Sequence, residues 1–179
     1  MSFFSFGRRS ASDAAPKPHA PPADLKAFER QYPGVQAELR ALRARIEANP
    51  LDTEPILDRA RYFLTSRLPS NRFNCADDCT RALELDPHCA SAYALRAQTW
   101  DTGTPQGKAP ARAALDYLSA WALDPTDTDS RAAALRLCAV IFKAKDAPEE
   151  FAALGELLAA RVGSARARKA LDGLEKELG

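Results

Sequence analysis

Three cysteines and one histidine near the middle of the chain are the residues whose types and spacing could hold a metal ion. Cys75 and Cys79 lie one helical turn apart, and His88 and Cys89 follow shortly after. Thiolate and imidazole groups are the usual zinc ligands, but this spacing is unusual for a zinc site. Cys75 and Cys79 also fall where a helix would pack small apolar side chains. We therefore expect no metal site, with zinc binding through these four residues as a less favoured alternative.

Two short segments resemble ligand-binding loops but lack essential parts. Residues 103–108 suggest a phosphate loop, yet their glycines are too close together and Ala109 replaces the hydroxyl residue. Residues 127–129 suggest a calcium loop, but the turn glycine is missing and Cys138 replaces the bidentate glutamate. No acid-base pair stands out elsewhere. We therefore expect no enzymatic activity and no cofactor.

The composition excludes several classes of partner. The 25 basic residues nearly balance the 24 acidic ones, so no field over the whole chain would attract nucleic acid or an anionic membrane. No apolar run approaches the length needed to span a bilayer, and the N-terminal residues lack the apolar core of a secretory signal. Four cysteines without framework spacing suit a reducing compartment. We therefore predict a cytoplasmic protein without membrane insertion or nucleic-acid binding.

The elements that would position these residues are helices arranged in a repeat. The pairs Asn49-Pro50, Asp86-Pro87 and Asp124-Pro125 recur 37 and 38 residues apart, and apolar residues between them follow helical spacing. Such a period indicates stacked helical hairpins. The predicted organisation is a disordered tail over 1–22, an N-terminal helical hairpin over 23–49, repeats over 50–162 (50–87, 88–125 and 126–162) and a capping helix over 163–179.

The repeat over 88–125 has a distinctive set of packing residues. Small and aromatic residues alternate at fixed intervals in both of its helices, at Tyr93, Ala97, Trp100, Ala113, Tyr117, Ala120 and the closing Pro125. The preceding copy is looser, with Ile56, Ala60, Phe63, Cys75, Cys79, Ala82 and Pro87. In a third copy the first-helix positions would fall on Arg131, Leu135 and Cys138.

This pattern resembles the tetratricopeptide repeat family. The resemblance implies an all-α fold: a right-handed superhelix of antiparallel helical hairpins, an α-solenoid, closed by a C-terminal capping helix. It also implies a non-enzymatic adaptor or scaffold that binds a partner polypeptide in a concave groove lined by the first helix of each hairpin. The heat-shock co-chaperone role known in this family is disfavoured, because Leu57, Leu95 and Ala133 stand where its polar clamp residues are expected.

The groove residues implied by the resemblance come from the first helices. They are Glu54, Leu57, Arg61, Leu64, Ala94, Gln98, Asp101 and Arg136. Arg61, Gln98 and Arg136 follow the small residue of each copy, and such donors would suit carboxylates or backbone carbonyls of a partner. Two alternative roles for the same groove are a bacterial immunity-type inhibitor of a toxin and a secretion chaperone for a client protein. The sequence leaves the oligomeric state and the partner's identity open.

Overall fold

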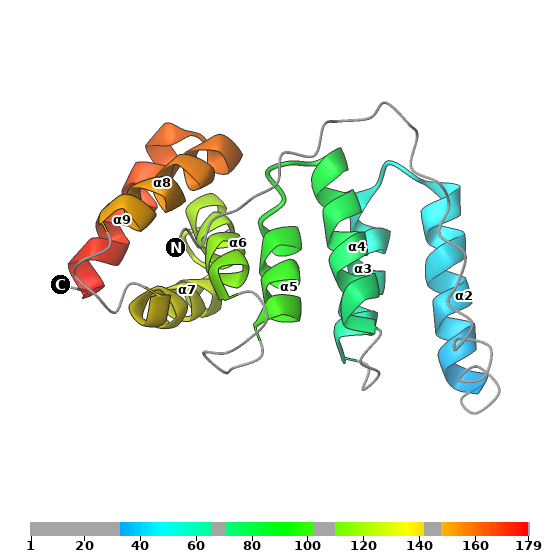
Figure 1. The fold of residues 1–179 in the computed structure, drawn as a ribbon. Coiled ribbons are helices and arrows are strands. Elements are labelled where there is room, and N and C mark those ends of the chain that lie inside the picture. Colours follow the sequence, from blue (N-terminus) through cyan, green and yellow to red (C-terminus); the bar gives the residue numbers. More distant parts are fainter. Residues whose placement is uncertain (1–32, 66–70, 102–109, 142–147, 179) are drawn as a thin grey trace. The chain divides into compact units, whose positions relative to one another are not determined.

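The computed structural model describes residues 33–65, 71–101, 110–141 and 148–178, and every regular element in these ranges is an α-helix (Figure 1). In chain order the described helices are α2 (Pro33–Ala48), α3 (Thr53–Thr65), α4 (Asn71–Leu85), α5 (Ala90–Trp100), α6 (Pro110–Leu123), α7 (Thr128–Ile141), α8 (Pro148–Val162) and α9 (Ser164–Leu178). The all-helical prediction is therefore confirmed for the described residues. The predicted tail over 1–22 and the first helix of the predicted N-terminal hairpin lie outside them.

The chain divides into two units, residues 1–37 and 38–179. In the first unit the structure describes only the first residues of α2, and the packing considered below lies within the second. No helix in the described ranges is both long enough and apolar enough to cross a bilayer.

The three Asx-Pro pairs make the same turn. In each, the carbonyl oxygen of the Asx residue accepts the amide three residues later, at 3.2 Å for Asn49, 3.1 Å for Asp86 and 3.1 Å for Asp124. The carboxylates of Asp86 and Asp124 also accept the amide two residues later, at 2.9 and 3.0 Å. Proline has no N–H to continue a helix, and Asp favours such turns through its side chain. The predicted helix boundaries at these pairs are confirmed.

Helices α3 to α6 form two successive hairpins. Helix α3 packs on α4 and α5 packs on α6, while α5 also contacts α4 and α3 (Figure 1). Ala60, Ala82, Ala97 and Ala120 are each 0% exposed at these contacts. A methyl side chain lets two helix axes approach closely, as the sequence pattern predicted for these four alanines.

The predicted register of the third copy was wrong by one residue. Arg131, placed in an aromatic position by the sequence pattern, is exposed, and Leu135 is only half-buried. Cys138, the third predicted position, is buried at 0% exposed, but the buried positions that continue the repeat lie one residue earlier, at Ser130, Ala134 and Leu137, which are 2%, 0% and 3% exposed. They follow Tyr93, Ala97 and Trp100 by a constant 37 residues. The 37-residue period of the buried positions is therefore kept in the third copy. The sequence does not show it clearly, because Ser130 stands where the second copy has the aromatic Tyr93.

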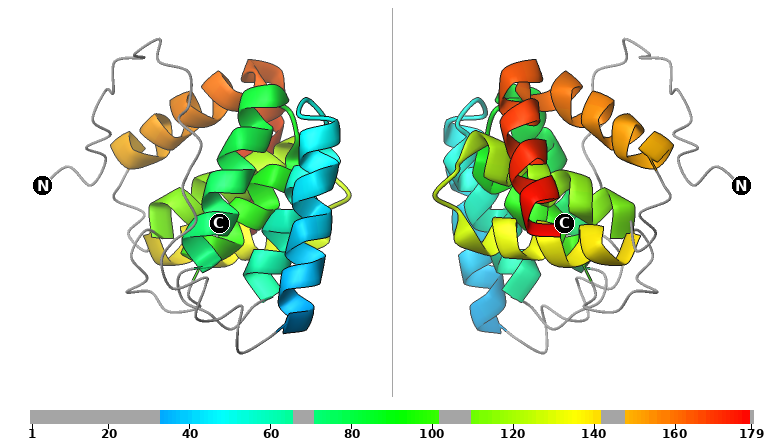
Figure 2. Two further views of the ribbon diagram at one scale, coloured as in Figure 1. Left: turned by 90° about the vertical axis from the view of Figure 1, so that its right-hand side faces the viewer. Right: turned by 90° about the vertical axis from the view of Figure 1, so that its left-hand side faces the viewer.

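Helix α6 is the centre of the C-terminal half. It contacts α5, α7, α8 and α9, and all of residues 113–120 are buried. Helix α7 packs on α6 and α9, and α8 packs on α9 and α6, so the C-terminal hairpin α8–α9 covers α6 (Figures 1 and 2). Arg131 of α7 forms an ion pair with Glu177 near the end of α9.

Helix α9 coincides with the segment for which a capping helix was predicted, but it buries a different stripe. Helical spacing of the leucines alone would bury a stripe of Leu171, Leu174 and Leu178, whereas Ala167, Ala170 and Leu174 are the buried residues and Leu178 is 37% exposed. Small residues face the neighbouring helices because α9 approaches α6 closely. At Gly173 an added Cβ would lie 2.9 Å from Cη2 of Trp121.

Candidate functional site

The first polar feature of the interior is an ion pair that ties α3 to α4. Arg59 donates from Nε to Oδ2 of Asp78 at 2.8 Å and from Nη2 to Oδ1 at 2.6 Å. The two side chains are 19% and 8% exposed. The hydrogen bond to Asp78 raises the pKa of Arg59 above its ordinary value, so the guanidinium stays charged despite its burial. The planar fork thus fixes both the distance and the rotation between the two helices.

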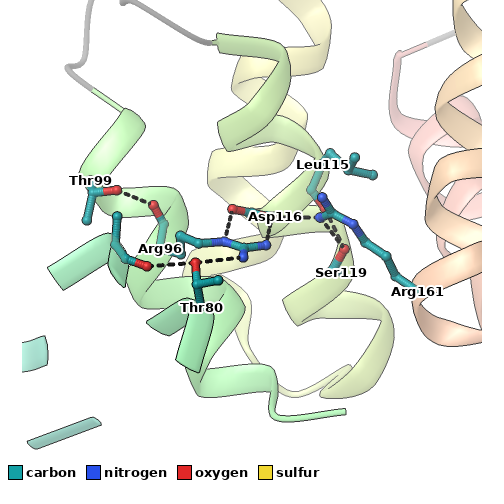
Figure 3. A network of polar contacts seen from close by, with 8 residues as sticks. Thr80, Arg96, Thr99, Leu115, Asp116, Ser119 and Arg161 are labelled. Atoms are coloured by element: carbon teal, nitrogen blue, oxygen red, sulfur yellow. Dashed lines mark hydrogen bonds and ion pairs between the residues drawn. The ribbon is translucent and has the colours of Figure 1, made fainter. Parts of the chain in front are cut away.

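The same pair recurs in the next hairpin. Arg96 of α5 donates from Nε and Nη2 to the two carboxylate oxygens of Asp116 on α6, both at 2.8 Å (Figure 3). Asp116 is 1% exposed. Burial acts to lower the pKa of Arg96, but the hydrogen bond and the charge of Asp116 outweigh it and raise the pKa. Arg59 and Arg96 each directly precede the buried alanine of their first helix, 37 residues apart.

A second arginine reaches Asp116 from the C-terminal hairpin. Arg161 of α8 donates from Nη1 to Oδ1 of Asp116 at 2.6 Å, and the same nitrogen lies 3.4 Å from Oγ of Ser119 (Figure 3). The guanidinium carbons of Arg96 and Arg161 each lie 5.5 Å from the ring centroid of Tyr93. Burial raises the pKa of Tyr93, although the two arginines act to lower it, so the ring stays neutral. We call Tyr93, Arg96, Asp116 and Arg161 the arginine cluster.

The predicted groove residues are placed on α3, α5, the end of α5 and α7. Arg61 is exposed and pairs with Asp58 at 2.9 Å and with Glu54 at 3.6 Å, all on α3. Arg136 of α7 pairs with Asp101 at the C-terminal end of α5. The acidic residues therefore neutralise the two arginines within the chain itself.

The apolar and amide members of the predicted groove differ in exposure. Leu57 is 1% exposed, so it belongs to the core and offers no contact surface. Leu64 and Ala94 are half-buried, and Gln98 is exposed. Helices α3 and α5 contact each other, so the predicted groove residues of these two helices lie on neighbouring helices.

The three cysteines and the histidine considered for zinc do not form one cluster. Within the described residues, no group of three or more His, Cys, Asp or Glu side chains is placed to hold a metal ion. Cys75 and Cys79 are 0% exposed in α4, whereas His88 is exposed beyond the end of that helix. The hydrogen bond to Cys75, followed by burial, raises the pKa of Cys79, so the thiol stays protonated. The zinc alternative is therefore not supported, and both cysteines act as small core residues.

A pocket of about 270 Å³ lies between α8 and α9. Phe151, Gly155, Ala159, Ala167 and Leu171 supply its apolar part. Ser164, Arg168, Asp172 and Glu175 supply its polar part. It is separate from the predicted groove residues, none of which lines it.

Comparisons with known proteins do not add a relative to this description. No protein-family model matches the chain, and neither the curated proteins nor the solved structures that were searched contain a match.

The arginine cluster was missed by the sequence analysis although a signal for it was present. Arg59 and Arg96 occupy the same position of the repeat, and so do Asp78 and Asp116, 38 residues apart. When oppositely charged residues recur beside the packing residues of successive repeats, they indicate a buried ion pair rather than a solvent-exposed helix face. Arg161 carries no such signal, because it lies outside the repeated pattern.

Proposed function

We propose that the chain is a tetratricopeptide-like, non-enzymatic module that binds a partner polypeptide on the neighbouring faces of its first helices, α3 and α5. The observation that carries the proposal is the repetition of one hairpin with one set of internal ties. Helices α3–α4 and α5–α6 end in the same Asx-Pro turn and are held by equivalent bidentate Arg–Asp pairs. Repeated hairpins place equivalent helix faces side by side, which is how repeat proteins build extended binding surfaces.

The chemistry of this face suits an extended polar segment with few apolar side chains. Its exposed members are Glu54 and Arg61 on α3 and Gln98 on α5, and α5 also carries Ala94, which is small and half-buried. Glu54 and Arg61 retain 65% and 43% side-chain exposure while paired. Exposed ion pairs contribute little to folding, so these groups can exchange their partner for one on a bound chain at low cost. The amide of Gln98 can donate to and accept from a peptide backbone.

Site-specific photo-crosslinking tests this proposal. A photoreactive residue at Gln98 or at Arg61 should capture the same polypeptide, and the same residue at Arg72, exposed on α4, serves as the matched control. Arg61→Glu should then weaken capture from position 98 several-fold without altering the helical content. Capture of that polypeptide with equal yield from position 72, or no effect of Arg61→Glu, would contradict the proposed face.

A further inference from the structure

The arginine cluster contains more positive charge than its partner can neutralise. Two guanidinium groups, 17% and 25% exposed, share the single carboxylate of Asp116. In the preceding hairpin the equivalent pair, Arg59 and Asp78, is one to one. Two half-buried cations that share one counter-charge are less well compensated than a one-to-one pair, so a further anion would be favourable beside them.

The surplus belongs to Arg161. Arg96 uses Nε and Nη2 on Asp116 and directs Nη1 to Oγ1 of Thr80 at 3.4 Å. Arg161 uses only Nη1, so its Nε–H and Nη2–H have no partner in the described part of the chain. Among the described residues, Nε1 of Trp100 is the only buried side-chain nitrogen or oxygen without a hydrogen-bond partner. Nε and Nη2 of Arg161 therefore keep contact with solvent.

The free side of Arg161 is held in a fixed orientation. The bond from Nη1 to Asp116 anchors one corner of the guanidinium, and the Tyr93 ring lies 5.5 Å from its central carbon. Asp86, the other carboxylate whose charge reaches Tyr93, is exposed and accepts the amide of His88. A guanidinium with a fixed plane and a free Nε/Nη2 edge can bind two oxygens of one carboxylate with parallel hydrogen bonds.

We propose that Arg161 is the centre of a carboxylate-binding site at the junction of α5, α6 and α8. The surplus of one positive charge matches a monoanionic carboxylate rather than a phosphate dianion. Tyr93 supports the guanidinium, and Asp116 and Arg96 set its position. The site does not depend on the binding face proposed on α3 and α5, because its residues are different ones.

The test is an NMR titration of the arginine side chains of the full-length chain. The Nε–H signal of Arg161 is assigned in the wild-type chain by through-bond correlation to its own backbone amide. Sodium acetate should move this signal in a saturable way, and sodium chloride at the same ionic strength should not. Arg161→Lys keeps the charge but lacks the fork, so acetate should then leave the neighbouring backbone amides of α5 and α6 unmoved.

Arg72, which is exposed on α4 and forms no ion pair within the described part of the chain, provides the internal control. Its Nε–H signal should follow ionic strength only. The assignment is overturned if acetate and chloride move the Arg161 signal equally, if acetate moves Arg72 as much as Arg161, or if phosphate saturates the shift and acetate does not. The wild-type titration decides the matter even where Arg161→Lys fails to fold.

Discussion

Replacement of Asp116 by asparagine is expected to be the most damaging single polar change in the described part of the chain. The carboxylate is 1% exposed and accepts three charge-assisted hydrogen bonds, two from Arg96 and one from Arg161. Asparagine keeps the shape but leaves two half-buried guanidinium groups uncompensated. Removing one partner of a buried ion pair costs about 3–5 kcal/mol, and the second orphaned cation places Asp116→Asn at the upper end of that range.

The arginines of the same cluster should respond very differently. Arg161→Met leaves the bidentate pair of Arg96 and Asp116 intact, and Arg161 is one-quarter exposed, so the expected loss is about 1 kcal/mol or less. In the Asp116→Asn background the sign should reverse. Arg161→Met should then stabilise the protein, because it removes one of two like charges that both lie against the Tyr93 ring.

Urea unfolding followed by far-UV circular dichroism measures these differences, with Asp78→Asn as the matched control. Asp78 holds only one arginine, so its loss should cost less than that of Asp116. A cost for Asp116→Asn no larger than that for Arg161→Met, or an Arg161→Met effect of the same sign in both backgrounds, would refute the reasoning.

Three further predictions concern packing, thiol accessibility and pH. Gly173→Ala should destabilise the chain by about 1–2 kcal/mol despite the higher helix propensity of alanine, and Trp121→Phe should rescue it in thermal unfolding, because an added Cβ would lie 2.9 Å from Cη2 of that ring. Iodoacetamide should label Cys89 first in the native protein, since it is half-buried, and mass spectrometry should find the 0% exposed thiols modified only after unfolding, at Cys75, Cys79 and Cys138. Burial, together with Asp101, raises the pKa of Tyr117 to about 12. The unfolded state therefore loses this proton first, and the free energy of unfolding should fall as the pH rises from 10 through 12. Tyr117→Phe should reduce that fall in urea titrations.

The local features of the fold could be predicted from the sequence because they depend on neighbouring residues. An Asx-Pro pair makes a turn through its own carbonyl, side chain and missing N–H, wherever the rest of the chain lies. The buried alanines follow from helical spacing for the same reason. The third register was missed because Ser130 is neither aromatic nor large, so the first helix of that copy offered no bulky residue with which to align.

The position of the C-terminal hairpin could not be predicted in the same way. Asp116 and Arg161 are 45 residues apart, and local spacing does not indicate which helix α8 will cover. A partial signal lay in α6, which is apolar nearly all round, with Asp116 and Ser119 as its buried polar residues. A helix of that kind must be covered on every side, not only along one stripe.

The hairpin pattern changes after α6 because apolar residues replace the Arg–Asp ion pair at the equivalent repeat positions. At the repeat positions that hold Arg96 and Asp116, the following segment carries Ala133 and Leu154, and Leu154 is 1% exposed. No Arg–Asp fork therefore holds α7 to α8, and α8 is free to pack with α9 on α6 while Arg161 supplies Asp116 with a second donor. Without this hairpin the apolar surface of α6 would face water and Asp116 would keep only one arginine. The C-terminal hairpin thus completes the core of the second repeat. Deletion of α8 and α9 should therefore also destabilise α5 and α6.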